Sequence, residues 1–140
     1  MEIYMKKVIG YYLFALVYNV SRLMPIKKNN VLCIMTHDDG EGSNVSLVAK
    51  VLRRRSADYS FSYITKKDTS KVKAGHNWSS ILNFFIQKPY QLARAQVVLM
   101  DNIFLPYAYL ARRKGTKVIQ LWHGTGTIKK FGQDVNTGKL

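Results

Sequence analysis

Apolar residues along residues 26–140 occur in short β-branched runs that alternate with longer segments of helical periodicity. Four of these runs predict strands, at residues 31–36, 59–64, 96–100 and 117–122. The segments between them predict helices at residues 43–55, 79–95 and 106–114, and a polar connection at residues 66–77. Because strands that alternate with helices are typical of parallel βαβ units, the sequence predicts an α/β fold with a Rossmann-like parallel sheet flanked by helices.

The first and the last predicted strands are both rich in apolar residues. Residues 31–36 form a nearly continuous apolar run, which predicts a strand buried on both faces, with Cys33 as a small buried hydrophobe. Residues 117–122 likewise predict a buried strand. Ser43 or Asn44 is suited to cap the helix after the first strand. Pro89 is expected to break or kink the later helix, because proline lacks a backbone N–H.

An uncharged segment at residues 8–21 precedes this region. Its 14 residues are too few for a helix that crosses a bilayer, which needs roughly 20. No small-x-small cleavage site follows it, so a cleaved signal peptide is disfavoured. Tyrosines and lysines beside the aliphatic residues favour an amphipathic helix over residues 1–25 that associates with a membrane surface. The alternative is a helix that packs against a protein domain.

Charge is distributed unevenly along the chain. The formal net charge is +14, and it increases from +5 over residues 1–70 (11 basic minus 6 acidic) to +9 over residues 71–140 (11 minus 2). Such a surface favours phosphates or anionic lipid as partners. Cys33 is the single cysteine, which excludes an intramolecular disulfide and a cysteine-based zinc site. No pair of histidines has metal-ligand spacing, so the sequence predicts no structural metal. No cofactor is expected either.

Three polar segments follow the predicted strands, at residues 37–44, 101–102 and 123–130. In open α/β sheets the ligand crevice lies beyond the carboxyl ends of the strands, so these segments are expected to line it. Gly40 and Gly42 do not complete a dinucleotide fingerprint, but they would let a ligand approach the backbone closely. His37 is a candidate for a supporting role, and His76 is expected to be solvated.

The most distinctive chemistry lies in residues 122–132, directly after the last predicted strand. His123 should emerge at the carboxyl edge of the sheet, where an imidazole can take a proton from an alcohol at neutral pH. Gly124 and Gly126 leave backbone N–H groups open, and Thr125 adds a hydroxyl group. Lys129 and Lys130 add two positive charges, which makes this segment a candidate anion cradle.

The run at residues 118–132 resembles the CDP-glycerol glycerophosphotransferases that build wall teichoic acid in Gram-positive bacteria. Asp101-Asn102, residues 112–115 and the aromatic N-terminal helix fit the same resemblance. It implies the N-terminal, acceptor-side half of a glycosyltransferase-B type fold, with residues 26–140 as a Rossmann-like domain that lacks the C-terminal donor half. Such a half is expected to be inactive alone, whether it is an excised domain or a truncated gene product.

The resemblance also implies a reaction and its partners. His123 would deprotonate the terminal hydroxyl of a polyprenyl-pyrophosphate-linked acceptor, glycerol phosphate would pass to it from CDP-glycerol, and CMP would leave. The acceptor and its phosphates would be held by Gly40, Gly42, Asn102, Gly124, Thr125, Gly126, Lys129 and Lys130. The enzyme would be a peripheral membrane protein on the cytoplasmic face of a bacterial plasma membrane. The alternative from the residues is a non-catalytic basic module for anionic membrane or nucleic acid, although nucleic acid is not expected because the aromatics are not interleaved with the basic residues.

Overall fold

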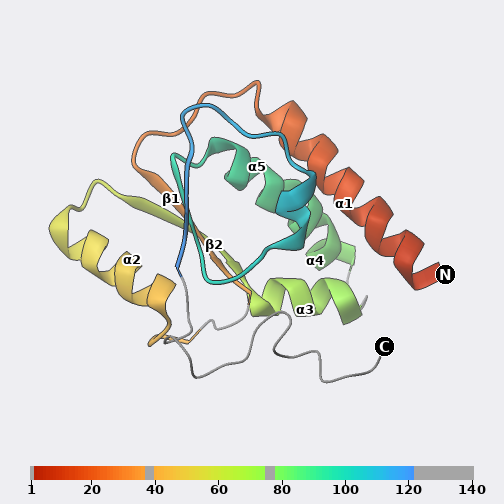
Figure 1. Cartoon of the computed structure of the whole chain (residues 1–140), viewed down its shortest axis with the longest axis horizontal. Coiled ribbons are helices and arrows are strands. Elements are labelled where there is room, and N and C mark those ends of the chain that lie inside the picture. Colours follow the sequence, from red (N-terminus) through yellow and green to blue (C-terminus); the bar gives the residue numbers. More distant parts are fainter. Residues whose placement is uncertain (1, 37–39, 75–77, 122–140) are drawn as a thin grey trace, which may run out of the picture.

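The computed structural model describes residues 2–36, 40–74 and 78–121, and the chain forms a sheet with helices on both sides (Figure 1). In chain order the elements are α1 (Glu2–Ser21), β1 (Asn30–Met35), α2 (Asn44–Arg55), β2 (Ser60–Thr65), α3 (Lys66–Ala74), α4 (Trp78–Leu82), the π-helical η1 (Asn83–Gln87), α5 (Lys88–Arg94), β3 (Val97–Met100), the 3₁₀ turn η2 (Leu105–Tyr109) and β4 (Lys117–Gln120).

The four strands form one parallel sheet in the order β2-β1-β3-β4. Ile34 of β1 lies opposite Ile64 of β2 and Met100 of β3, so the carboxyl ends of the strands meet at one edge. The predicted α/β fold with a Rossmann-like parallel sheet is confirmed.

Each face of the central strand β1 lies in a different apolar core. Leu32 and Ile34 point into a core with α1, η1 and α5. Val31, Cys33 and Met35 point to the opposite side, where α2 contributes Val45 and Ala49. All six residues of β1 are buried, as a parallel strand covered by helices on both faces requires.

The ends of α2 follow the predicted local chemistry. The Ser43 side chain accepts a hydrogen bond from the Ser46 backbone N–H at 3.3 Å, which satisfies a donor that the first turn leaves open. Arg53, Arg54 and Arg55 occupy the last turn, where cations interact favourably with the helix dipole.

Pro89 disturbs the helix in a more local way than a break. In a regular α-helix its ring would clash with the carbonyl group of Phe85, four residues earlier. The chain widens into the π-helix η1 immediately before α5 and then continues. Gly10 of α1 lies against this widened turn, since a Cβ there would be 3.2 Å from the Phe85 ring.

Two predicted segments differ from the structure. Residues 66–77 were expected to form a polar connection, but α3 occupies Lys66–Ala74. Thr65 and Asp68 start this helix as a reciprocal cap, because each side chain accepts a hydrogen bond from the other residue's backbone N–H, at 3.4 and 2.9 Å.

The helix expected at residues 106–114 is only the short turn η2. Leu110 is extended, residues 111–113 are not helical, and a turn at residues 114–115 leads into β4. Long-range hydrogen bonds hold the segment at residues 110–113. The Tyr18 hydroxyl donates to the Ala111 carbonyl group, and the Arg113 guanidinium donates to the carbonyl groups of Met24 and Ala93.

The strand expected at residues 117–122 is present as β4, but the prediction that it is buried is wrong. All four residues of β4 are exposed, with Val118 41% and Ile119 45% accessible. Val118 and Ile119 point to opposite faces, and β4 is the outermost strand, so both of its faces are open among the described residues.

The predicted N-terminal helix is present as α1 and packs on the core. Phe14 lies between the rings of Phe84 and Phe104, at centroid distances of 5.7 and 5.8 Å. The opposite side of α1 is also apolar, so its polar and apolar residues are not segregated as an amphipathic helix would have them. None of the helices in the described part of the chain is long and apolar enough to cross a bilayer.

Candidate functional site

The carboxyl edge of the sheet brings together the ends of β1, β3 and β4. The Asp101 backbone N–H donates to the Ile34 carbonyl group at 3.2 Å, and the Leu121 N–H donates to the Met100 carbonyl group at 2.7 Å. The segments that follow β1, β3 and β4 therefore leave the sheet at neighbouring positions, as the sequence predicts.

The structure describes three of the predicted site residues. Gly40 and Gly42 are exposed in the turn before α2, and a Cβ on Gly42 would meet no atom within 4 Å. Asn102 follows β3 and is half-buried, and its side-chain carbonyl oxygen accepts a hydrogen bond from the Ile103 N–H at 2.8 Å. All three residues lie in segments that leave the carboxyl edge.

The other predicted site residues lie outside the described residues. They are His123, Gly124, Thr125, Gly126, Lys129 and Lys130, and the weaker candidates His37 and His76 also fall outside.

Asp101 is a buried carboxylate at this edge. It is 4% exposed and directly follows β3, between the ends of β1 and β4. The sequence marked Asp101 only as part of a resemblance, and the structure adds that this residue is buried where β3 ends.

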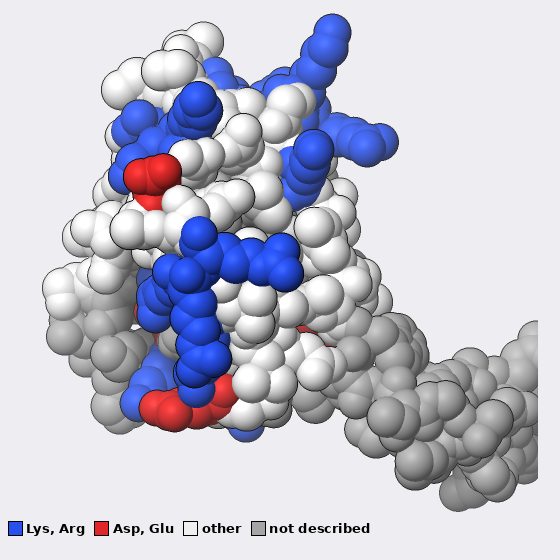
Figure 2. Space-filling model, turned by 90° about the vertical axis from the view of Figure 1, so that its left-hand side faces the viewer, with Lys and Arg blue, Asp and Glu red and all other residues white. Residues whose placement is uncertain are grey.

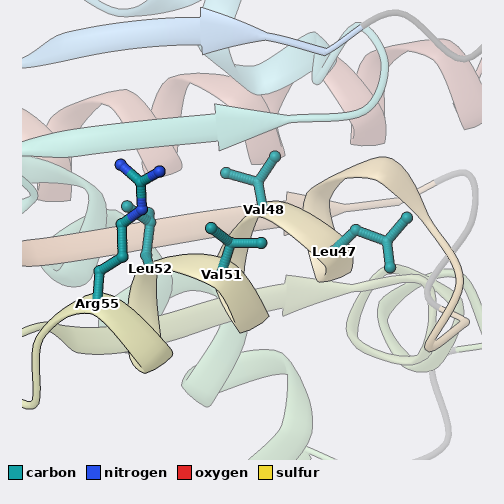
Figure 3. Close-up of a pocket in the computed structure, with 5 residues that line it drawn as sticks. All are labelled: Leu47, Val48, Val51, Leu52 and Arg55. Atoms are coloured by element: carbon teal, nitrogen blue, oxygen red, sulfur yellow. The ribbon is translucent and has the colours of Figure 1, made fainter.

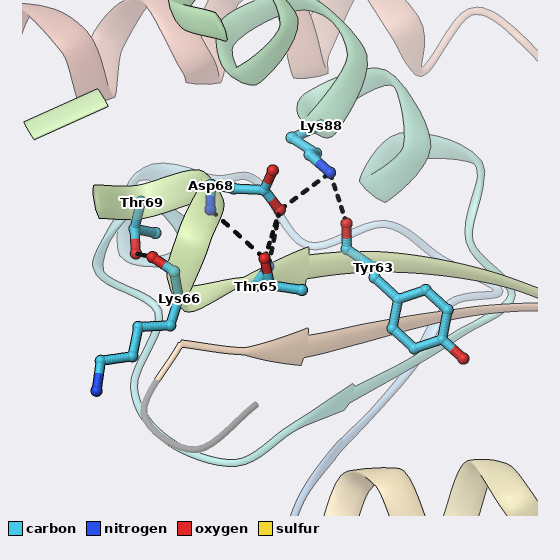
Figure 4. A network of polar contacts seen from close by, with 6 residues as sticks. All are labelled: Tyr63, Thr65, Lys66, Asp68, Thr69 and Lys88. Atoms are coloured by element: carbon cyan, nitrogen blue, oxygen red, sulfur yellow. Dashed lines mark hydrogen bonds and ion pairs between the residues drawn. The ribbon is translucent and has the colours of Figure 1, made fainter. Parts of the chain in front are cut away.

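A polar network closes the carboxyl end of β2 (Figure 4). One Asp68 oxygen accepts hydrogen bonds from the Thr65 N–H at 2.9 Å and the Thr65 hydroxyl at 3.1 Å, and it forms an ion pair with the Lys88 ammonium at 3.2 Å. Lys88 also donates to the Tyr63 carbonyl group at 2.7 Å. The network therefore joins α3, α5 and β2.

The charge state of Asp68 follows from this network. Burial alone would raise its pKa, but the hydrogen bonds from Thr65 and the charge of Lys88 outweigh burial and hold the pKa below the ordinary value. Sequence reasoning missed this group, although Thr65-Lys-Lys-Asp68 has the spacing of a helix capping box.

Two hollows lie elsewhere on the described surface, and neither is lined by a predicted site residue. One, of about 240 Å³, runs along a flank of α2 and is lined by Leu47, Val48, Val51, Leu52 and Arg55 (Figure 3). The other, of about 560 Å³, lies between η2 and β4. The lining of the first is aliphatic apart from Arg55, which does not suit a nucleotide phosphate.

Cys33 is not suited to act as a nucleophile at this site. Burial raises the pKa of the Cys33 thiol to about 12, with a smaller opposing effect of Arg53, so the thiol is an unsuitable nucleophile at neutral pH. Within residues 2–36, 40–74 and 78–121, no group of three His, Cys, Asp or Glu side chains is arranged to hold a metal ion.

Comparison with known proteins gives a consistent set of relatives. The sequence model of the family described as CDP-Glycerol:Poly(glycerophosphate) glycerophosphotransferase matches residues 16–140. The chain is 29% identical over 121 residues to a teichoic acid poly(ribitol-phosphate) polymerase of Bacillus spizizenii. The aligned region covers 86% of this chain and 18% of that polymerase.

Two primases are also similar. A teichoic acid ribitol-phosphate primase of Bacillus spizizenii is 28% identical over 116 residues, 83% of this chain and 29% of the primase. A teichoic acid glycerol-phosphate primase of Bacillus subtilis is 45% identical over 47 residues, 34% of this chain and 12% of the primase. The matched regions thus span less than a third of the length of these relatives.

Proposed function

The chain belongs to the CDP-Glycerol:Poly(glycerophosphate) glycerophosphotransferase family, and on that premise we propose that it is the acceptor-side half of a teichoic acid glycerophosphotransferase. The relatives are teichoic acid primases and polymerases, which supports a phosphotransferase family in teichoic acid synthesis. The observation that carries the proposal is the position of Leu121, whose N–H bond to the Met100 carbonyl group leads the chain out at the carboxyl edge immediately before Trp122-His123.

The proposed reaction moves one proton and one phosphoryl group. His123 takes the proton from the terminal hydroxyl of a polyprenyl-pyrophosphate-linked acceptor. The acceptor oxygen then bonds to the phosphorus that carries glycerol in CDP-glycerol, the bond from that phosphorus to the CMP oxygen breaks, and CMP leaves. Lys129 and Lys130 stabilise phosphate charge, while Gly124, Thr125 and Gly126 provide donors.

Residues on the neighbouring loops contribute the remaining acceptor contacts in this proposal. Gly40 and Gly42 precede the capped N-terminus of α2, and open space beside Gly42 allows close approach to its backbone. Asn102 uses its carbonyl oxygen locally, on the Ile103 N–H, and we assign its amide N–H₂ group to the acceptor.

Two features of the proposal extend beyond this chain. The CDP-glycerol contacts belong to a donor half, so we expect turnover only in a polypeptide that supplies it. Because the proposed acceptor is lipid-linked, we place the enzyme on the cytoplasmic face of a bacterial plasma membrane.

Glycerol phosphate is the proposed transferred unit. Competition between CDP-glycerol and CDP-ribitol as donors tests this choice, since the relatives include enzymes named for each alcohol.

The deciding experiment measures CMP release from CDP-glycerol and a lipid-linked acceptor by a polypeptide that joins this chain to a donor half. His123→Ala should lower the rate by about 10²-fold or more, because a positioned general base contributes this much. His76→Ala is the matched control, since the sequence predicts a solvated imidazole at this position, and it should retain the parent rate. A His123→Ala variant as active as the parent would refute the proposed mechanism.

A further inference from the structure

Acidic residues are scarce in this chain, and one of them is buried at the carboxyl edge of the sheet. The sequence has 8 Asp and Glu residues against 22 Lys and Arg. Asp101 is 4% exposed and directly follows β3. Removing a carboxylate from water costs free energy unless hydrogen bonds or a counter-charge compensate for it. No step of the proposed reaction yet uses this residue.

The register of the sheet places Asp101 beside the end of β4. Met100 of β3 lies opposite Gln120 of β4, so the next position in each strand brings Asp101 beside Leu121. The Leu121 N–H donates to the Met100 carbonyl group at 2.7 Å, while the Asp101 N–H donates to a carbonyl group of β1 at 3.2 Å. The backbone of Asp101 is therefore fixed next to the point from which the chain continues to His123.

Chain connectivity limits the distance between Asp101 and His123. His123 follows Leu121 by two residues, and two residues of fully extended chain span at most about 7 Å. Neighbouring strands of a sheet lie about 4.8 Å apart. Because both side chains extend several ångströms from the backbone, a hydrogen bond between the Asp101 carboxylate and the His123 imidazole is within reach.

Three other carboxylates of the described residues have partners or lie elsewhere. Asp68 forms an ion pair with Lys88 at the end of β2. The Glu41 side chain is 95% exposed and forms an ion pair with Lys50 at 3.4 Å. Asp58 is exposed and precedes β2, at the opposite edge of the sheet. Of these four carboxylates, only Asp101 is buried beside the end of β4.

A general base at this edge has to accept a proton in a positive environment. Figure 2 shows that Lys and Arg outnumber Asp and Glu on the side of the molecule that it displays. Residues 71–140 carry a net charge of +9 (11 basic minus 2 acidic). An imidazole that takes up a proton becomes a cation, which nearby cations such as Lys129 and Lys130 disfavour. A carboxylate beside the ring would offset this repulsion.

We propose that Asp101 is the positioning residue of the general base, and that its carboxylate accepts a hydrogen bond from one ring N–H of His123. The other ring nitrogen then faces the acceptor hydroxyl and removes its proton. The proton moves from the acceptor oxygen to His123, and Asp101 stabilises the imidazolium that forms without taking the proton itself. The inference rests on the proposed function and adds a second residue to the base.

Other ionisable groups share this edge by sequence, because they directly follow β1 or lie in the segment after β4. They are His37, Asp38, Asp39, Lys129, Lys130 and Asp134, all outside the described residues. At the end of β2, Asp68 and Lys88 offset each other's charge. The three acidic members of the list are the rival partners of His123, so the test includes them.

The pKa of His123 in the 140-residue chain tests the proposal without donor or acceptor. NMR titration follows each imidazole, and His123→Ala identifies the resonances of His123. Asp101→Asn should lower the pKa of His123 by about 1 or more, because an adjacent carboxylate favours the charged ring by this much. Asp58→Asn, the same change at an exposed carboxylate on the opposite edge, is the matched control and should leave the pKa of His123 unchanged.

The parent chain gives a readout that does not depend on a variant. His123 should titrate above the ordinary value of about 6.5, although the surrounding charge is positive. A lower value in the parent would overturn the proposal. So would an unchanged pKa in an Asp101→Asn chain with the far-UV circular dichroism of the parent, or a larger fall in Asp38→Asn, Asp39→Asn or Asp134→Asn.

Kinetics in a polypeptide that includes a donor half supply the second arm. Asp101→Asn should lower the rate of CMP release by about tenfold or more and move the acid limb of the pH profile of kcat/KM to lower pH. Asp101→Glu keeps the carboxylate and should recover part of the rate, which a purely structural role would not require. If Asp101→Asn kept the parent rate and pH profile, Asp101 would not act on the base.

These outcomes are separate from the test of the proposed function. The NMR titration needs no turnover, so it reports on the pairing of Asp101 with His123 even if His123→Ala proves fully active. That combination would refute the proposed mechanism while the pairing stands. A lowered rate in His123→Ala with no pKa change in Asp101→Asn would refute only the role of Asp101.

Discussion

The strands β1 and β4 belong to the same parallel sheet and both carry β-branched residues, but their burial is opposite. β1 pairs on both sides and is covered by helices on both faces, so all six of its residues are buried. β4 pairs only with β3 among the described residues, and all four of its residues are exposed. A strand's sequence therefore predicts that it is a strand, while its neighbours decide how much of it is buried.

Thiol labelling should give the largest contrast between the two strands. Burial raises the pKa of Cys33 in β1 to about 12, from an ordinary value of 9.0, so near pH 8 its thiolate fraction is about 10³-fold below that of an ordinary thiol. Ile119→Cys in β4 should introduce a thiol that reacts with a maleimide or disulfide reagent in minutes, while Cys33 stays unmodified in the folded chain. Mass spectrometry of digested, labelled protein separates the two sites. Rapid labelling of Cys33 in the parent would contradict the burial of β1.

Truncation of an apolar side chain should likewise lower stability more in β1 than in β4. Ile34 is fully buried, and Ile34→Ala is expected to lower the free energy of unfolding by about 2–5 kcal/mol through lost burial and a residual cavity. Ile119→Ala removes the same atoms from a side chain that is 45% exposed, and it should cost less than about 1 kcal/mol. Urea unfolding monitored by tryptophan fluorescence measures both. Similar losses for the two variants would mean that β4 is covered in solution.

The parts of the fold that the sequence predicted depend on local chemistry. The apolar run of β1, the Ser43 cap of α2 and the disturbance at Pro89 each follow from a few adjacent residues. The spacing of Thr65 and Asp68 is an equally local indication that α3 starts there. The helix was not predicted because the lysines around them favoured a polar connection.

The parts that could not be predicted depend on distant residues. The segment at residues 110–113, after η2, is fixed by the Tyr18 hydroxyl and by the contacts of Arg113, whose partners lie far away in sequence. The exposure of β4 depends on which strand and helices cover it. Which apolar residues of α1 are buried and which are exposed became evident only when one side of the helix was placed on the core. For the site, convergence at the carboxyl edge was predicted from strand order, while the roles of His123 and its neighbours stay predictions.

Removal of the ion pair between Asp68 and Lys88 should give the smallest change in stability. It tests whether polar contacts help to hold α5 against the central strands. The Lys88 ammonium on α5 joins Asp68 at the start of α3 to the Tyr63 carbonyl group of β2, so α5 is held against the sheet by a polar contact as well as by its apolar face. Asp68→Asn removes the charge but keeps an acceptor for Thr65. We expect a loss of roughly 1 kcal/mol at pH 7, the usual size of a helix-cap contact and a partly exposed ion pair.

The pH dependence of that loss identifies its cause. Because the pKa of Asp68 is lower in the folded chain than in the unfolded chain, the stabilisation is fully present above the unfolded value of about 3.9 and disappears as the pH falls through the folded pKa. The difference in unfolding free energy between the parent and Asp68→Asn should thus be constant from pH 7 to pH 5 and shrink below pH 4. Asp58→Asn, at an exposed carboxylate between α2 and β2, serves as the matched control. A difference that stays constant down to pH 2 would show that Asp68 acts by the shape of its side chain, and the central strands would then be covered by apolar packing alone.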